Sequence, residues 1–321
     1  MWVIALIVIS VGVFWKEISK NCEGWNSSMA HLRKFRLASD GDGLAIIQNE
    51  RGTCFNGEYP LKIFPQKGLE WIELSDITCF YGSNGSGKTT LLNIIGEKLN
   101  VIRHSEFSNS AFFGRYLECC QAYGIVPENR QFLSSDDVFD YVMNMRYLNQ
   151  DIDDHREQLI KGYATMRHRA GLDEEYCHLH GLDDYDRWKE AKSAYLKNNT
   201  QSKFINERLA RNIDMFSNGE TALRYFTEHI DRDALYLLDE PENSLSIKFQ
   251  LDLAKYIEDS ARFYNCQFII STHSPIFLSL KNALVYNLDK KPVTTEKWTD
   301  LENVRKYYDF FKSHETEFEN D

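Results

Sequence analysis

The sequence lacks several features that would assign it to common protein classes. Its seven cysteines are odd in number and show no framework spacing, which argues against a secreted, disulfide-stapled protein and favours a reducing compartment. It has no excess of positive charge: 37 Lys and Arg against 48 Asp and Glu leave a net charge of −11, so no global field attracts nucleic acid. The charged central region shows no sustained heptads, which argues against long coiled-coil arms.

The longest apolar run, Trp2 to Trp15, is short for a membrane span. As a helix its 14 residues would measure about 21 Å, against a hydrocarbon core of about 30 Å. It has neither a basic n-region nor a small-x-small cleavage site. Three interpretations of residues 1–28 stay open: an extraneous leader before a start at Met29, a short membrane anchor, and a cleaved signal. We expect a cytoplasmic protein, tethered through residues 2–15 only if the anchor is retained, because Lys16 and Lys20 would then stay inside.

A glycine-rich loop at residues 82–89 satisfies G-x-x-x-x-G-K-[ST] in full. Strand-like residues 71–74 and 77–81 precede it, and a helix with apolar residues on one face follows it. Glycines let such a loop turn its N–H groups toward phosphates, and the helix N-terminus adds positive charge. Lys88 should reach the β- and γ-phosphates, and Thr89 should ligate Mg²⁺. The predicted nucleotide-binding residues are Gly82, Ser83, Asn84, Gly85, Ser86, Gly87, Lys88, Thr89 and Thr90.

Two adjacent carboxylates, Asp239 and Glu240, follow an apolar segment, 235–238, that reads as a buried strand. Acids at the tip of an apolar strand are costly unless an ionic group occupies the site. We therefore expect a magnesium-bound nucleoside triphosphate and an attacking water there. The alternative is a strand that ends in a solvated acidic turn. A second predicted strand, 266–270, leads to His273, whose place beside the first strand tip favours a catalytic role.

Ser217, Asn218, Gly219 and Glu220 lie between these motifs. The pattern S-x-x-E is a capping box for a helix over 221–230, and an exposed helix start is also a phosphate site that could serve a second subunit. Both interpretations can hold together. After the acidic pair we expect an amphipathic helix with Ile247, Leu251, Ala254, Ile257 and Ala261 on its apolar face.

The set GSNGSGKT, SNGE, YLLDEPE, NSLS and STHS resembles the Walker A, signature, Walker B, D-loop and switch histidine of ABC-type ATPases, in the family order. Over roughly residues 30–290, the resemblance implies an α/β P-loop NTPase fold: a mixed sheet flanked by helices, with an inserted helical lobe. It also implies a head-to-tail homodimer with ATP sandwiched between one subunit's P-loop and the other's signature.

The resemblance implies a role for each motif residue. Asp239 would hold Mg²⁺ through water, Glu240 would polarise the attacking water, and His273 would contact the γ-phosphate. Ser217 and Gly219 would cap the partner's ATP. Catalysis would be positioning and electrostatic stabilisation of a phosphoryl transfer. The glutamine that senses Mg²⁺ is assigned to Gln131, with Gln121 as the second candidate, and the adenine has candidate aromatic neighbours in Phe55 and Tyr59.

Several details resemble the SMC, RecF and OLD-like group, which includes compact stand-alone bacterial ATPases. These are the sequence leading into the P-loop, Glu-Asn after the Walker B proline, and STHSP. The signature, with Asn218 and Glu220, departs from that of transporters. The resemblance implies ATP hydrolysis with ATP and Mg²⁺, by a nucleotide switch in DNA repair, recombination or phage defence. The alternatives are the ATP-binding subunit of an ABC transporter and a weakly hydrolysing module that controls a partner effector.

Partners and domains follow from the same pattern. A nuclease would be a separate partner in trans. DNA contact would need a local basic strip, for which residues 33–36 and 167–169 are the candidates. We interpret each of these two strips first as a solvated surface. We expect a leader at 1–28, the first half of the core with Walker A at 29–103, an inserted strand and helical lobe at 104–216, and the remaining motifs with the tail at 217–321. In the lobe we expect strand character over 104–126, as at 111–113 and 116–117, a capped helix start at 134–139 and charged helices over 150–212. Cys177, His178 and His180 read as a polar turn or helix face rather than a metal site.

Overall fold

The computed structural model describes residues 30–49, 59–105, 107, 109–172, 183, 185–186, 188–189, 200–209 and 218–319. The apolar leader, Phe55, Ser217 and the Cys177 to His180 group lie outside these residues. Within the described ranges, every helix is too short or too polar to cross a membrane.

The chain divides into two compact units. The first contains the described residues up to Leu133, then Ile230–Glu242 and the chain from Gln250 onward; the second contains Ser134–His229 and Asn243–Phe249. The domain boundaries that we expect from the sequence stay a prediction.

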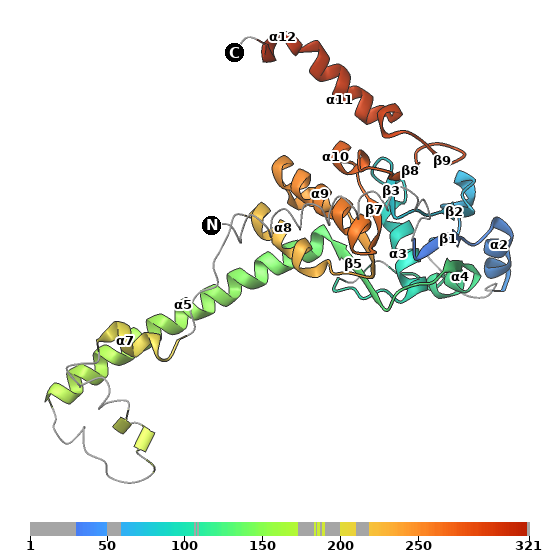
Figure 1. Ribbon diagram of the computed structural model, residues 1–321. Helices are drawn as coiled ribbons and strands as arrows, with labels where there is room; N and C mark the ends of the chain where they lie inside the picture. The colour runs from blue at the N-terminus through green and yellow to red at the C-terminus, as the bar shows by residue number, and fades with distance from the viewer. Residues whose placement is uncertain are drawn as a thin grey trace, which may run out of the picture. The chain divides into compact units, whose positions relative to one another are not determined.

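A mixed six-stranded sheet in the order β5-β6-β7-β3-β8-β9 forms the centre of the first unit (Figure 1). Strands β6, β7, β3 and β8 are parallel, and β9 is antiparallel to β8. The three strands predicted around the motifs are confirmed as β3, β6 and β7. Their residues are nearly all buried, as expected for parallel strands covered on both faces. The strands are β3 (Ile77–Tyr81), β5 (Asn129–Ser134), β6 (Ala234–Asp239), β7 (Gln267–Ser271), β8 (Leu284–Asn287) and β9 (Thr294–Thr295).

A smaller antiparallel sheet in the order β2-β1-β4 belongs to the same unit. Its strands are β1 (Leu32–Arg36), β2 (Trp71–Glu73) and β4 (Gln121–Gly124). The predicted strand at 71–74 is therefore present, but in this sheet and not beside the P-loop strand. In β1, Phe35 is buried, while Lys34 and Arg36 pair with acidic side chains.

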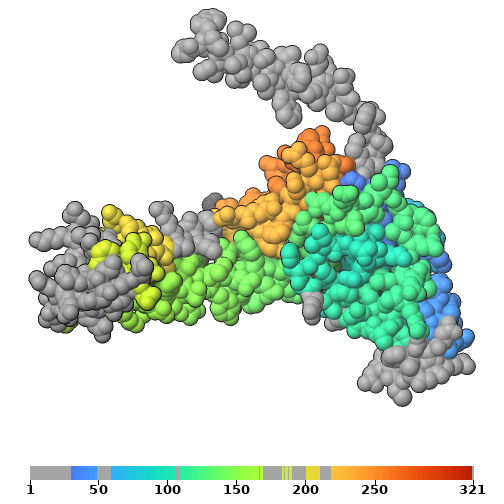
Figure 2. All heavy atoms as spheres, turned by 90° about the horizontal axis from the view of Figure 1, so that it is seen from below, coloured from blue at the N-terminus to red at the C-terminus, as the bar shows by residue number. Residues whose placement is uncertain are grey.

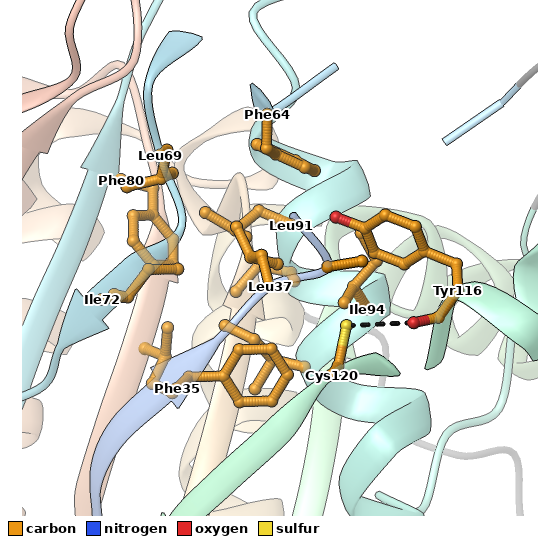
Figure 3. Packing of buried hydrophobic residues seen from close by; sticks show 14 of the residues in the cluster. Phe35, Leu37, Phe64, Leu69, Ile72, Phe80, Leu91, Ile94, Tyr116 and Cys120 are labelled. Atoms are coloured by element: carbon orange, nitrogen blue, oxygen red, sulfur yellow. Dashed lines mark hydrogen bonds between the residues drawn. The ribbon is translucent and has the colours of Figure 1, made fainter. Parts of the chain in front are cut away.

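The hydrophobic core joins this small sheet to the helix that follows the P-loop, α3 (Lys88–Leu99). Figure 3 shows Phe35 and Leu37 facing Leu91 and Ile94, with Tyr116 beside them. The predicted apolar face of α3 is confirmed: Leu91, Leu92, Ile94, Ile95 and Leu99 are all buried. This packing fixes the start of α3, and hence the P-loop, against the sheet.

The strand character predicted over 104–126 is confirmed only in part. Strand β4 occupies Gln121–Gly124, whereas the segment before it forms α4 (Phe113–Cys119). Phe113 and Tyr116 are both buried, and their spacing of three residues places them on one helix face. Aromatic composition favours a strand, but here the helical spacing prevails. A preceding helix, α2 (Asp40–Asn49), contacts α4.

The second unit is built on α5 (Ser135–Leu172), a single helix of 38 residues, about 57 Å long. Its predicted cap is confirmed: Asp137 Oδ2 accepts the N–H of Ser134 at 2.8 Å, and Ser134 Oγ accepts the N–H of Asp137 at 3.1 Å. α7 (Gln201–Asn206) lies along α5 in Figures 1 and 2. The ring of Phe204 in α7 packs on Tyr163 in α5, with centroids 5.2 Å apart. α8 (Asn218–His229) also packs on α5, through Tyr225 and Tyr141.

The expected apolar face of the helix after the acidic pair is partly wrong. In α9 (Ile247–Phe263) the buried side chains include Leu253, Ala254 and Ile257, whereas Ile247 and Leu251 are 71% and 55% exposed. Both faces have helical spacing, so periodicity alone cannot choose between them. The remaining elements are η1 (Pro65–Lys67), η4 (Pro241–Ser244), α10 (Pro275–Leu278), η5 (Trp298–Asp300), α11 (Glu302–Ser313) and α12 (Glu315–Phe318).

Candidate active site

The P-loop connects β3 to α3, as its motif predicts. Gly87 is the N-cap of α3 with φ 99°, a conformation that favours glycine. A Cβ on Gly82 would lie 2.4 Å from Ser86 Oγ, so the loop closes on itself only with glycine there. Lys88 is buried, and its Nζ donates to the Gly82 carbonyl oxygen at 3.0 Å. The N–H groups of the first turn of α3 have no intrahelical acceptor, so this turn can receive an anion.

Two side chains outside the motif hold this loop, and sequence analysis missed both. Lys67 Nζ donates to the carbonyl oxygens of Ser86 at 2.6 Å and Leu288 at 2.7 Å. Asp289 accepts the Ser83 N–H at 2.8 Å and the Ser83 hydroxyl at 2.7 Å. Burial lowers the pKa of Lys67 below its ordinary 10.5. The contacts of Lys67 with Ser86 and of Asp289 with Ser83 join parts of the chain that are distant in sequence. No local sequence pattern predicts them.

The Walker B aspartate lies next to the P-loop threonine. Thr89 Oγ1 donates to Asp239 Oδ1 at 3.1 Å, and Ser271 Oγ donates to the same oxygen. Burial raises the pKa of the Asp239 carboxyl above its ordinary 3.8, and the hydrogen bonds from Ser271 and Thr89 oppose that rise. Because a nearby cation would favour the ionised form, and because the donors are all oxygen, this pair fits Mg²⁺.

Lys88, Glu240 and His273 meet at the carboxyl ends of the parallel strands. Glu240 Oε1 lies 3.4 Å from Lys88 Nζ and 3.4 Å from His273 Nε2. Lys88 Nζ and His273 Nε2 are 2.6 Å apart. The tautomer of the imidazole decides which of the two nitrogens donates in this contact. Glu240 itself has φ 46°, a left-handed conformation that is uncommon outside glycine. The three predicted residues are thus brought together.

The described signature residues start α8 in the second unit. Asn218 and Glu220 are exposed, and Gly219 is partly buried. Arg146 of α5 donates to Asn218 Oδ1 at 2.8 Å. A Cβ on Gly219 would lie 2.9 Å from the Phe249 ring, so glycine allows close packing at this helix start. Ser217 lies outside the described residues, and its predicted roles stay predictions.

The glutamine candidates have other hydrogen-bond partners in the structure. Gln131 in β5 donates to Asn129 Oδ1 at 3.2 Å, and Gln121 in β4 accepts from the Tyr123 hydroxyl. Tyr59 stacks on Phe113 with ring centroids 6.3 Å apart, and its hydroxyl lies 3.4 Å from Thr90 Oγ1. That contact places Tyr59 at the first turn of α3.

The chain matches the model of the ABC transporter family over residues 71–243, more than half of its length, and that of the AAA ATPase domain over residues 210–278. Comparison with curated proteins gave no match. Among solved structures, one similar chain is the Smc head domain of Pyrococcus furiosus with an extended coiled coil, bound to the C-terminal domain of ScpA, at 14% identity over 88% of this chain and 99% of that chain, with a TM-score of 0.37.

Two other similar structures are an SMC head domain and an ATP-binding cassette. The SMC head domain of Thermotoga maritima has 13% identity over 84% of this chain and 99% of that chain, with a TM-score of 0.37. The dimeric post-hydrolysis structure of an ATP-binding cassette bound to ADP and Pi has 14% identity over 72% of this chain and 90% of that chain, with a TM-score of 0.33. The ABC transporter match contains both the P-loop and the acidic pair.

Proposed function

Because the chain belongs to the family of ABC-type ATPases, we propose that it hydrolyses ATP to ADP and phosphate. The observation that supports this most directly is the meeting of Lys88, Glu240 and His273 within 3.4 Å. A base, a cation and an imidazole converge there on the first turn of a phosphate-binding helix.

In this proposal each group has one task. The P-loop and Lys88 bind the phosphates, Glu240 accepts a proton from the attacking water, and His273 contacts the γ-phosphate. Thr89 and Asp239 would hold Mg²⁺, which supplies charge neutralisation at the phosphates. Gln131 stays the first candidate for an additional magnesium contact.

We further propose that the complete site forms in a head-to-tail homodimer. One copy would present its P-loop, and the other would present Ser217, Asn218, Gly219 and Glu220 at the start of α8. The exposure of Asn218 and Glu220 supports this, since a second copy could reach them.

The motif details support a nucleotide switch of the SMC, RecF and OLD-like group, working in DNA repair, recombination or phage defence, with an effector or nuclease as a separate partner. The match to the ABC transporter family favours a second candidate, the ATP-binding subunit of a transporter. Copurification with an integral membrane protein would distinguish the transporter subunit from the switch.

The test of hydrolysis is Glu240→Gln, which keeps the side-chain shape and removes the base. We expect turnover to fall by about 10²- to 10⁴-fold, while ATP affinity stays within about twofold because the P-loop is intact. Light scattering should detect an ATP-bound dimer of the variant. Glu258→Gln is the matched control, because Glu258 accepts the Lys281 N–H at 2.9 Å and belongs to none of the motifs. Unchanged turnover without a trapped dimer would refute the assignment and favour a weakly hydrolysing binding module.

A further inference from the structure

Glu242, two residues after the proposed base, binds the segment that carries His273. Its Oε1 accepts the N–H of His273 at 2.5 Å and the N–H of Ser274 at 3.2 Å. The hydroxyl of Thr272 donates to the same oxygen at 2.8 Å. One carboxylate oxygen thus receives donors from three consecutive residues.

This arrangement fixes His273 at both ends. Its main-chain N–H binds Glu242, and its ring Nε2 lies 3.4 Å from Glu240 Oε1. Glu242 belongs to the short helix η4, which begins directly after Glu240. The turn that follows the proposed base therefore carries the carboxylate that holds the proposed γ-phosphate contact.

The partners of the Glu242 carboxylate are the three donors of residues 272–274 and not a cation. Among the described residues, Glu242 forms no ion pair, and its buried second oxygen, Oε2, has no hydrogen-bond partner. Charge-assisted hydrogen bonds are about twice as strong as neutral ones. Successive main-chain N–H groups that converge on one anion form a defined concave site. The carboxylate thus acts as an internal anion that sets the backbone of residues 272–274.

We propose that Glu242 is a positioning residue for ATP hydrolysis, acting through His273. This inference rests on the proposed function of the site. It makes the glutamate after the Walker B proline part of the catalytic geometry, although it is not assigned a contact with the nucleotide.

The experiment is a double-mutant cycle of Glu242→Ala and His273→Ala, with Glu258→Ala as the matched control. We expect Glu242→Ala to lower kcat by about 10- to 100-fold, as a misplacement of about 1 Å does, with KM changed by less than about threefold. In the His273→Ala background, Glu242→Ala should cause no more than about a twofold further loss. Glu242→Gln keeps an acceptor oxygen, and its kcat should lie between those of the wild type and Glu242→Ala.

A second measurement does not depend on activity. Amide hydrogen exchange of the peptide around His273 and Ser274 should be faster in Glu242→Ala, and unchanged in Glu258→Ala. If the wild-type protein did not hydrolyse ATP, the proposed function would fail, while the exchange result would still test the contact. The positioning role is overturned if the kcat losses of the two variants multiply, or if exchange at this segment is the same in Glu242→Ala and the wild type.

Discussion

Lys67 supplies a test of how the P-loop is held, because it supports the loop from outside the motif. Lys67→Met keeps the length of the side chain and removes the ammonium that donates to Ser86 O at 2.6 Å and Leu288 O at 2.7 Å. Only the Ser86 contact restrains the P-loop directly. A hydrogen bond from a charged donor contributes about 1.5 to 3 kcal/mol, which is about 10- to 150-fold in a dissociation constant. Because a loosened loop recovers part of its shape around bound phosphates, we expect the Kd for ATP to rise by about tenfold, the lower end of this range.

Charge alone would give a smaller effect, and the chain offers a control for it. Lys291 is exposed and close enough that its charge helps to lower the pKa of Lys67, but no hydrogen bond to the P-loop is found for it among the described residues. At about 8 Å in water, one pair of unit charges is worth about 0.5 kcal/mol, and salt at 0.15 M screens it further. Lys291→Met should therefore change the Kd by no more than a few-fold.

The assay is a titration with a fluorescent ATP analogue at 0.15 M salt, with thermal unfolding as the check that each variant is folded. If the hydrogen bond from Lys67 to Ser86 holds the P-loop in shape, Lys67→Met must weaken ATP binding clearly more than Lys291→Met does. Equal weakening by the two variants would assign the effect to long-range charge. A Kd of Lys67→Met within twofold of the wild type would show that the hydrogen bond from Lys67 to Ser86 does not contribute to ATP binding.

Two further predictions concern the metal pair and a helix cap. Asp239→Asn should abolish the gain in ATP affinity on adding Mg²⁺, and Thr89→Ala should reduce that gain less, because Thr89 supplies a neutral oxygen. Titrations of ATP in the presence of Mg²⁺ and of EDTA measure the gain. An unchanged magnesium dependence in Asp239→Asn would contradict the prediction. The N–H and hydroxyl of Ser39 bind Asp42 and lower the pKa of its carboxyl below 3.8. Asp42 therefore stabilises the fold above pH 3.8, and that stability is lost as the pH falls through the lowered pKa. Asp42→Asn should lower the free energy of unfolding by about 1 kcal/mol near pH 7. The difference in Tm between the variant and the wild type should disappear in acid, and a difference that is independent of pH would refute this explanation.

The parts of the fold that the sequence predicted are those with a local cause. The P-loop, its helix and the strands β3 and β6 depend on residues adjacent in the chain, and the cap of α5 needs only Ser134 and Asp137. The wrong predictions arose where two local patterns compete. Phe112 and Phe113 suit a strand by composition but Tyr116 completes a helical spacing, and α9 offers two apolar faces of which only tertiary packing selects one.

The parts of the site that could not be predicted depend on contacts across the chain. Lys67 and Asp289 are charged residues in or beside turns, and such residues are usually solvated. In the sequence, Glu242 stands out only as part of the Glu-Asn pair after the Walker B proline. Its partners at residues 272–274 become its neighbours because β6 and β7 pair in parallel, and a single sequence does not give that register.

Lys88 has a central place in this electrostatic arrangement. Its ammonium lies near Glu240 and His273 together, so in the proposed function the phosphates of ATP compete with both for one cation. A triphosphate carries more charge than a carboxylate, and it is also bound by the N–H groups of the loop, so Lys88 should favour the phosphate. The contacts of Glu240 and His273 with the Lys88 ammonium would then be released. Because Glu242 holds the backbone of His273 throughout, the ring could change partners without leaving the site. ATP binding would thereby free Glu240 to accept a proton from the attacking water.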